Sequence, residues 1–289
     1  MIKSFLQFLE FEKRYSKHTI VAYENDLAQF TEHLSNHHIN TQAADADFSI
    51  LRSWVIFLME QGITSRSVNR KIATLHSFFN YLQKENYRLD NPALRLKSLK
   101  TGKKLPDFLR EQELEQFLDE ANFPQNYEGY RDRLILELFY GTGIRLSELL
   151  NLKEEDVNLF ANTLKVTGKR NKQRIIPILP QLIELIKTYT IEKKLAFNGK
   201  DLAWFFVNSK GEQAYPVMIQ RIVRKYIQRG NSSPHLLRHT YATHLLNHGA
   251  DINAIKDLLG HANLAATQVY THNSMEKLKA VFEKAHPKA

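Results

Sequence analysis

The sequence contains no cysteine. This absence excludes thiolate metal sites, iron–sulfur clusters, disulfide bonds and a cysteine nucleophile. Covalent catalysis by this chain would therefore use an oxygen or a nitrogen nucleophile. Long hydrophobic runs are also missing, because no stretch reaches the roughly 18 uncharged apolar residues of a membrane-spanning helix. The N-terminal segment carries Glu10, Glu12 and Lys13 where a signal peptide would be apolar, so we expect a helix there and a cytoplasmic protein.

Acidic residues are fewer than basic ones. The 289 residues include 40 Lys and Arg against 31 Asp and Glu, which gives a net charge of +9 at pH 7. A surplus of this size favours a polyanionic partner such as nucleic acid. The length corresponds to about two domains of 100–200 residues. With 43% hydrophobic residues, each domain can bury a core of its own.

The N-terminal part has apolar residues at helical spacing, for example Val68, Ile72, Leu75 and Phe79. We expect about four helices and a helical bundle over residues 1–90. Residues 91–107 have the composition of a linker, with breakers at both ends and a run of basic residues that contains no acid. The basic residues of this run are Arg95, Lys97, Lys100, Lys103 and Lys104. They either contact DNA phosphates or are merely solvated, and charge alone leaves both possibilities open.

Residues 108–289 have a mixed pattern. Two β-rich segments, Thr163–Val166 and Arg174–Ile178, flank a basic tip and predict a hairpin. Helical spacing predicts helices over 111–120, 130–140, 180–194, 216–228, 234–248, 251–259, 263–270 and 274–284. The last of these has an apolar face that either docks on a neighbouring molecule or caps the core of its own domain. The expected fold class is mainly α, with a small β-sheet in the second domain.

Two short segments carry side chains suited to phosphate chemistry. His235 and Arg238 are three residues apart near a helix start at Pro234, so they share a helix face where backbone N–H groups also bind anions. The alternative is a capping histidine and a surface arginine. Arg145 lies at a corner after two glycines, and the neighbouring Glu148 either supports it or forms a purely structural ion pair with it.

A third segment pairs a glycine corner with a downstream tyrosine. Gly260 is placed to end a helix, His261 follows it, and Tyr270 comes nine residues after His261. With 12 tyrosines in the chain, spacing alone does not single out Tyr270.

Histidine pairs four residues apart could suggest a metal site. The pairs are His235 with His239 and His244 with His248. Neither pair has the glutamate of an H-E-x-x-H motif, and Arg238 between the first two opposes a cation. We predict no metal site and no cofactor.

These segments together resemble the tyrosine recombinase, or phage integrase, family. The resemblance rests on an ordered set: G-T-G-I-R-L-S-E-L, a basic hairpin tip, H-L-L-R-H, L-G-H and a terminal tyrosine. Residues 233–272 are most similar to bacterial Xer recombinases of the XerC and XerD type. The resemblance extends over essentially the whole chain. It implies a SAM-like core-binding domain at 1–90 and a catalytic domain at 108–289, forming a C-shaped clamp on DNA.

The resemblance also implies a role for each motif residue. Tyr270 would be the nucleophile, Glu148 a supporting acid, and the scissile phosphate would be surrounded by Arg145, Lys169, His235, Arg238 and His261. Lys169 is preferred to Lys172 because it directly follows Gly168 in the hairpin. Fixed donors of this kind stabilise the charge of a five-coordinate phosphorus, so the chemistry needs no metal.

The implied function is site-specific DNA recombination through a 3′-phosphotyrosyl intermediate, with chromosome dimer resolution at cell division as the process. The implied partners are a duplex recombination site, a sister Xer recombinase and an FtsK-type translocase. The implied assembly is a tetramer on DNA. Besides the linker, the expected DNA contacts are Arg66, Asn69, Arg70, Lys71, Arg170 and Lys172. The alternatives are a mobile-element integrase, a type IB topoisomerase and a non-catalytic architectural DNA-binding protein.

Overall fold

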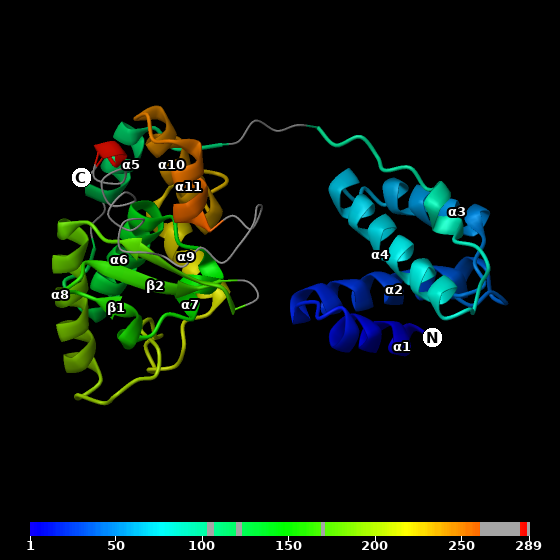
Figure 1. The fold of residues 1–289 in the computed structure, drawn as a ribbon, viewed down its shortest axis with the longest axis horizontal. Coiled ribbons are helices and arrows are strands. Elements are labelled where there is room, and N and C mark those ends of the chain that lie inside the picture. Colours follow the sequence, from blue (N-terminus) through cyan, green and yellow to red (C-terminus); the bar gives the residue numbers. More distant parts are fainter. Residues whose placement is uncertain (103–106, 120–122, 169–170, 261–283, 288–289) are drawn as a thin grey trace. The chain divides into compact units, whose positions relative to one another are not determined.

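The computed structural model describes residues 1–102, 107–119, 123–168, 171–260 and 284–287. The chain divides into two compact units, Met1–Lys104 and Leu105–Ala289, each with a hydrophobic core of its own (Figure 1). Helices dominate both units, which confirms the mainly α fold class. In the part of the chain that is described, no helix is long and apolar enough to cross a membrane.

The first unit is the helical bundle that the sequence predicts. Three of its helices begin at residues whose side chains, those of Ser16, Asp47 and Thr64, accept a hydrogen bond from a backbone N–H three residues later. Their inward faces meet in a core that includes Phe30, Trp54 and Phe78. The elements are α1 (Ile2–Gln7), the π-helical turn η1 (Phe8–Glu12), α2 (Lys17–His37), α3 (Phe48–Glu60), α4 (Ser65–Lys84) and the 3-10 turn η2 (Pro92–Arg95).

The first part of the expected linker is packed onto this bundle. Ala93 and Leu96 are buried in the core of the first unit. The side-chain amide of Asn69 then holds the backbone of Leu99, donating to its carbonyl at 2.9 Å and accepting from its N–H at 2.7 Å. The interpretation of 91–107 as a linker throughout is therefore corrected, because apolar residues alternate with the basic ones and fix the chain as far as Leu99.

The second unit contains the predicted hairpin within a three-stranded antiparallel sheet of order β1-β2-β3. In this sheet Leu164 lies opposite Ile176 and Val166 opposite Arg174. The sequence did not predict β1, which has only two residues and so no alternation to detect. The elements are α5 (Glu111–Asp119), α6 (Tyr127–Thr142), α7 (Leu146–Leu150), η3 (Glu154–Asp156), β1 (Val157–Asn158), β2 (Thr163–Thr167), β3 (Gln173–Pro177), α8 (Pro180–Ala196), α9 (Pro216–Tyr226), α10 (Pro234–Asn247) and α11 (Ile252–Leu259).

Helix α6 forms the centre of the second unit and packs against α8 and α10 (Figure 1). It ends at Gly143, whose φ of +60° belongs to the left-handed region that favours glycine. A Cβ at this position would lie 2.5 Å from the ring of Tyr241, so the close approach of α10 also requires glycine. This turn directs the chain towards Arg145 and α7. The helices expected at 263–270 and over nearly all of 274–284 lie outside the described residues.

Acid should destabilise the first unit through His33. This side chain of α2 is buried beside His37 and Phe57, and neither ring nitrogen has a hydrogen-bond partner among the described residues. Burial, together with the charges of His37 and His38, lowers the pKa of His33 below 6.5. As the pH falls through this value the unfolded chain binds the proton more readily than the folded one, so the free energy of unfolding decreases.

We expect the denaturant concentration at which this unit is half unfolded to decrease when the pH is lowered from about 7.5 to about 5.5. In a His33→Phe variant this decrease should be smaller, because the titrating group is gone. The measurement is denaturant unfolding followed by Trp54 fluorescence in a Trp204→Phe background. His18→Gln, at an exposed histidine of the same helix, is the control. An unchanged pH dependence in His33→Phe would contradict this assignment.

Candidate active site

The carboxylate of Glu148, at the start of α7, lies at the centre of a buried charged cluster and has no exposed side-chain surface. Arg174 binds both of its oxygens through two N–H groups, at 2.6 and 2.9 Å. Arg145 binds it through the side chain and through the backbone N–H, both at 2.8 Å. Burial raises the pKa of Glu148, but the bonds and charges of Arg174 and Arg145 outweigh it and lower the pKa to about 2. The group is therefore an anion at neutral pH.

The C-terminal end of α11 orients three guanidinium groups. The last carbonyls of a helix lack partners within the helix and carry partial negative charge, so they attract cations. Here three successive carbonyls accept from three arginines of different segments: Leu258 from Arg174 at 2.9 Å, Leu259 from Arg238 at 2.7 Å and Gly260 from Arg145 at 2.8 Å. We call these three arginines and Glu148 the arginine cluster.

Arg238 is buried, whereas Arg145, the other motif arginine, is partly exposed. Arg238 extends from α10 and also donates to the carbonyl of Gly143 at the end of α6. Burial, followed by the positive charges of Arg145 and Arg174, lowers the pKa of Arg238 to about 10. The group stays protonated at neutral pH. The cluster thus contains three guanidinium charges and the single carboxylate of Glu148, which leaves a surplus of positive charge suited to a phosphodiester.

Two glycines allow the chain to pass close to this cluster. Gly260, at φ +63°, lies over Arg174, and a Cβ there would be 3.1 Å from the Cδ of that side chain. Gly168 follows β2 beside Glu148, where a Cβ would lie 3.1 Å from a carboxylate oxygen. The hairpin tip therefore begins directly next to the cluster. Of its basic residues, Lys172 is exposed, whereas Lys169 and Arg170 lie outside the described residues.

The histidines of α10 occupy different environments. His235 is exposed in the first turn of the helix, and Arg238 lies one turn further along. The side chain of Ser233 caps this turn by accepting a hydrogen bond from the N–H of Leu236. His244 is buried and bonded to the carbonyl of Leu109 and the hydroxyl of Tyr140, at 2.8 and 3.0 Å. His244 therefore packs in the interior of the second unit. No group of three or more potential metal ligands is found in the described part of the chain.

The structure thus brings Arg145, Glu148 and Arg238 together and places His235 on the helix of Arg238. His261, Tyr270, Lys103 and Lys104 lie outside the described residues, as do the two hairpin residues named above. Sequence reasoning missed Arg174. A signal was available, because in a strand that alternates in burial Arg174 occupies an inward position.

The residues of α4 that were expected to bind DNA divide into two groups. Lys71 is buried, with its ammonium 2.9 Å from Asp26, and Asn69 is used in the contact with Leu99. The expected DNA contact at Lys71 is therefore withdrawn, and Asn69 receives a structural role. Arg66 is exposed, and Arg70 is partly exposed while also paired with Asp26.

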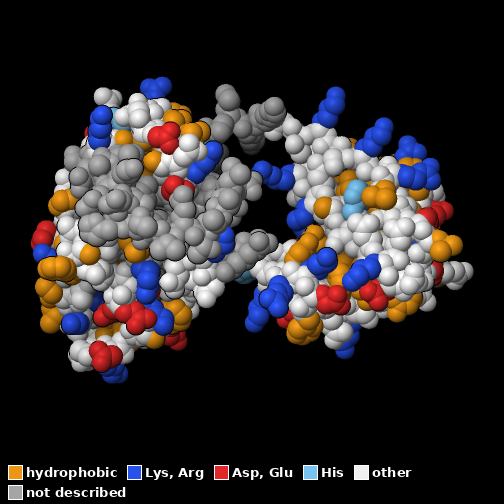
Figure 2. All heavy atoms as spheres, in the orientation of Figure 1, with side chains coloured by type: hydrophobic (Ala, Val, Ile, Leu, Met, Phe, Trp, Pro, Cys, Tyr) orange, Lys and Arg blue, Asp and Glu red, His pale blue; other side chains and the backbone are white. Residues whose placement is uncertain are grey.

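The linker residues Arg95, Lys97 and Lys100 are exposed. The guanidinium of Arg95 lies 4.2 Å from the centre of the Phe48 ring. Figure 2 shows lysine and arginine side chains spread over the visible face of the first unit.

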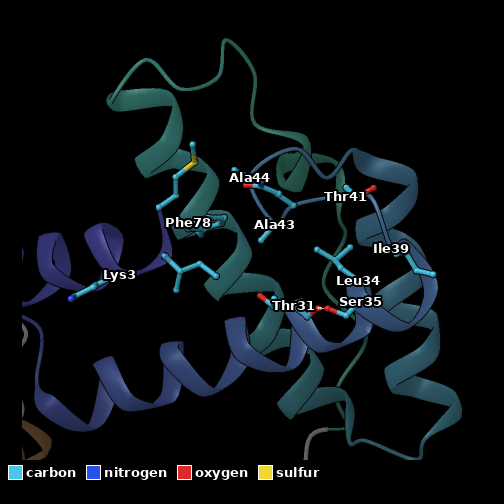
Figure 3. Close-up of a pocket in the computed structure, with 12 residues that line it drawn as sticks. Lys3, Thr31, Leu34, Ser35, Ile39, Thr41, Ala43, Ala44 and Phe78 are labelled. Atoms are coloured by element: carbon cyan, nitrogen blue, oxygen red, sulfur yellow. Dashed lines mark hydrogen bonds between the residues drawn. The ribbon is translucent and has the colours of Figure 1, made fainter.

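A groove of about 510 Å³ in this unit is lined mainly by apolar side chains such as Leu34, Ile39 and Phe78, and contains none of the predicted site residues (Figure 3).

Comparisons with known proteins agree with this arrangement. The model of the phage integrase family matches residues 107–277, and the model of the phage integrase N-terminal SAM-like domain matches residues 2–86. Tyrosine recombinase XerC of Oceanobacillus iheyensis is 38% identical over 295 residues, covering 100% of this chain and 96% of that one. Tyrosine recombinase XerD of Staphylococcus haemolyticus is 36% identical over 297 residues, covering 100% and 99%.

Two solved structures have the same fold. The XerH site-specific recombinase bound to its difH substrate has a TM-score of 0.70 at 23% identity, covering 99% of this chain and 82% of that one. The Tn1549 transposon integrase in complex with circular intermediate DNA has a TM-score of 0.69 at 17% identity, covering 96% and 98%. From these matches and the ordered motifs, we conclude that the chain belongs to the phage integrase family and is a tyrosine recombinase, a site-specific enzyme that cuts and rejoins DNA.

Proposed function

We propose that Tyr270 cuts one strand of a duplex recombination site and forms a 3′-phosphotyrosyl intermediate, and that the cell uses this reaction to resolve chromosome dimers. The observation that carries the proposal is the arginine cluster, which holds a surplus of positive charge at the end of α11. His261 follows that end directly, and Tyr270 lies further along the same segment. The chromosomal role is supported by relatives named XerC and XerD that are 36–38% identical.

Arg145 and Arg238 act on the non-bridging oxygens of the scissile phosphate. Attack raises the negative charge on these oxygens, so donors fixed in advance bind the transition state more tightly than the ground state. Arg145 is suited to this because its side chain is 31% exposed and, among the described residues, only Glu148 and Gly260 accept from its guanidinium, through two of its five N–H groups. Arg238 and His261 supply further donors. One donor of this kind contributes about 10²–10³ in rate.

Two proton transfers accompany the exchange of bonds. The tyrosine hydroxyl has an ordinary pKa of about 10, so its proton must leave as the oxygen attacks, and His235 accepts it. The new bond joins Tyr270 to phosphorus, and the bond to the 5′-oxygen breaks. Lys169 protonates this leaving oxygen from the hairpin tip. A 5′-hydroxyl of a second duplex then reverses these steps, so rejoining needs no ATP.

The cellular setting is proposed on the same basis. The enzyme works in the cytoplasm as a tetramer on DNA, with a sister Xer recombinase and an FtsK-type translocase as partners. A mobile-element integrase is the alternative, supported by the shared fold of the Tn1549 transposon integrase. Sequencing the DNA trapped on Tyr270 in cells separates the two, because a dimer-resolving enzyme is trapped at one chromosomal site. A non-catalytic architectural protein would trap no DNA.

The first test is the identity of the nucleophile. We expect the wild-type chain to form a covalent adduct with a nicked recombination-site DNA and Tyr270→Phe to form none, because the variant lacks the attacking oxygen. Denaturing gel electrophoresis of labelled DNA measures the adduct. Tyr215→Phe, at an exposed tyrosine of the same unit, should react like wild type. An adduct that persists in Tyr270→Phe would exclude this tyrosine as the nucleophile.

The second test concerns the general acid. Lys169→Ala should slow cleavage of ordinary DNA by about 10²-fold or more, the usual contribution of a positioned acid. A substrate with sulfur in place of the 5′-bridging oxygen should restore its rate, because the sulfur leaves without a proton. Lys172→Ala, at the other hairpin lysine and an expected DNA contact, is the comparison: at saturating protein the sulfur substrate should give it no gain over wild type. If only Lys172→Ala is rescued, the roles of the two lysines are reversed.

The third test concerns the basic residues that follow the packed start of the linker. Replacing Lys97 and Lys100 by Gln should weaken DNA binding and reduce the steepness of its salt dependence. The logarithmic slope should change by about 0.9 for each phosphate that the variant no longer neutralises. Binding isotherms at several salt concentrations give the slope. Lys187→Gln, at an exposed lysine of α8 paired with Glu184, is the control. An unchanged slope would mean that these two residues are only solvated.

A further inference from the structure

Arg174 is a charged residue at a position where the sheet pattern calls for an apolar one. It lies on the inward face of β3, opposite Val166, and its side chain is only 6% exposed. A guanidinium in such a place is costly unless its donors are satisfied. Each of its three nitrogens donates one hydrogen bond to a described residue, two to the carboxylate oxygens of Glu148 and one to the carbonyl of Leu258 at the end of α11. The planar fork of arginine fits this arrangement, whereas the point charge of a lysine does not.

These contacts connect Arg174 to Arg145 along two routes. The first runs through Glu148, because the carboxylate that Arg174 holds also accepts from the side chain and the backbone N–H of Arg145. The second runs through α11, because Arg174 binds the carbonyl of Leu258 and Arg145 binds that of Gly260. The turn at Gly260 rests directly on Arg174, with the site of a missing Cβ 3.1–3.3 Å from its side chain.

A purely stabilising role accounts poorly for this arrangement. Arg174 brings a third positive charge close to Arg145 and Arg238, and its charge is among the causes that lower the pKa of Arg238. Buried ion pairs are in general no more stable than apolar residues that fill the same volume. The charge of Arg174 repels those of Arg145 and Arg238, which opposes folding. The same charge makes the electrostatic potential more positive where a phosphate would bind. The arrangement is therefore better suited to binding a phosphate than to holding the core together.

We propose that Arg174 is a positioning residue of the recombination reaction, which fixes the guanidinium of Arg145 and the end of α11 in the geometry that the phosphate requires. The proposal rests on the proposed function, in which Arg145 acts on the non-bridging oxygens. Arg174 itself makes no contact with the reacting atoms. Its effect should therefore appear in the rate of cleavage and leave DNA affinity nearly unchanged.

The test compares variants that separate charge from geometry. Arg174→Lys keeps the charge but loses the fork, and Arg174→Met loses both. Arg174→Met combined with Glu148→Gln removes the charge of both partners, which keeps the chain foldable if the single variant does not fold. The control is Lys193→Met, at another buried cation of the same unit, bonded to Glu154 and to the carbonyl of Trp204 at 3.0 and 2.7 Å. Each full-length variant is measured for its folded fraction, its DNA affinity and its single-turnover rate of adduct formation at saturating protein.

We expect Arg174→Lys to bind DNA with an affinity close to that of wild type and to form the adduct about 10²-fold more slowly, the size of effect expected when a catalytic group is displaced by about 1 Å. The double variant should be at least as slow, although it contains no unpaired buried charge at these two positions. Lys193→Met should form the adduct at the wild-type rate once the folded fraction is taken into account. A wild-type rate in Arg174→Lys, or a reduction in the double variant no larger than in the control, would overturn the proposal.

The substrate with a 5′-bridging sulfur adds a second criterion. It removes the need for the general acid but leaves the charge on the non-bridging oxygens unchanged, so it should not restore Arg174→Lys. Full restoration would mean that Arg174 acts through the hairpin tip and Lys169, which would overturn the assignment to Arg145. A failure of the proposed function is distinguishable, because Tyr270→Phe would then still form the adduct whatever the Arg174 variants do.

Discussion

The ion pairs that the buried carboxylate of Glu148 makes with Arg145 and Arg174 are the interaction on which the second unit depends. Without the carboxylate, the buried Arg174 and the partly exposed Arg145 would lie close together with only backbone carbonyls to offset their charges, and an unpaired buried ion costs several kcal/mol. The carboxylate also accepts the backbone N–H of Arg145 and so fixes the start of α7. One side chain therefore joins a helix start, a strand and, through the arginines, the end of α11. The fold and the anion site share the same bonds.

Much of the fold could be predicted from local signals. Helix starts at Ser16, Asp47 and Thr64 carry capping side chains, and the alternation in 163–178 indicated the hairpin. The packed start of the linker was missed, since the prediction followed the five basic residues between 95 and 104 and gave no weight to the apolar residues among and before them. Only the tertiary contacts of Ala93 and Leu96 reveal that this stretch belongs to the bundle.

The motif residues of the candidate site could be named from the sequence, but the hydrogen bonds that hold them together could not. Arg145, Glu148 and Arg238 stand in short patterns with a chemical meaning, so the sequence could single them out. The carbonyls of α11 could not be found in this way, because backbone acceptors leave no mark in a sequence. The inward position of Arg174 in its strand was a signal that could have been used, but its partners are distant in sequence and could not be named. Lys71 illustrates the opposite error, in which a basic residue counted towards a DNA surface is neutralised inside the unit by Asp26.

The end of α11 has a consequence for local stability. Helix ends usually fray at little cost, because their terminal carbonyls bind water as readily as protein. Here the three terminal carbonyls bind the three arginines, so opening the last turn would remove one hydrogen bond from every guanidinium of the cluster at once. The stability of this helix end is therefore coupled to that of the cluster. Thermal opening of the last turn would therefore loosen the three guanidinium groups together, while Glu148 still holds Arg145 and Arg174.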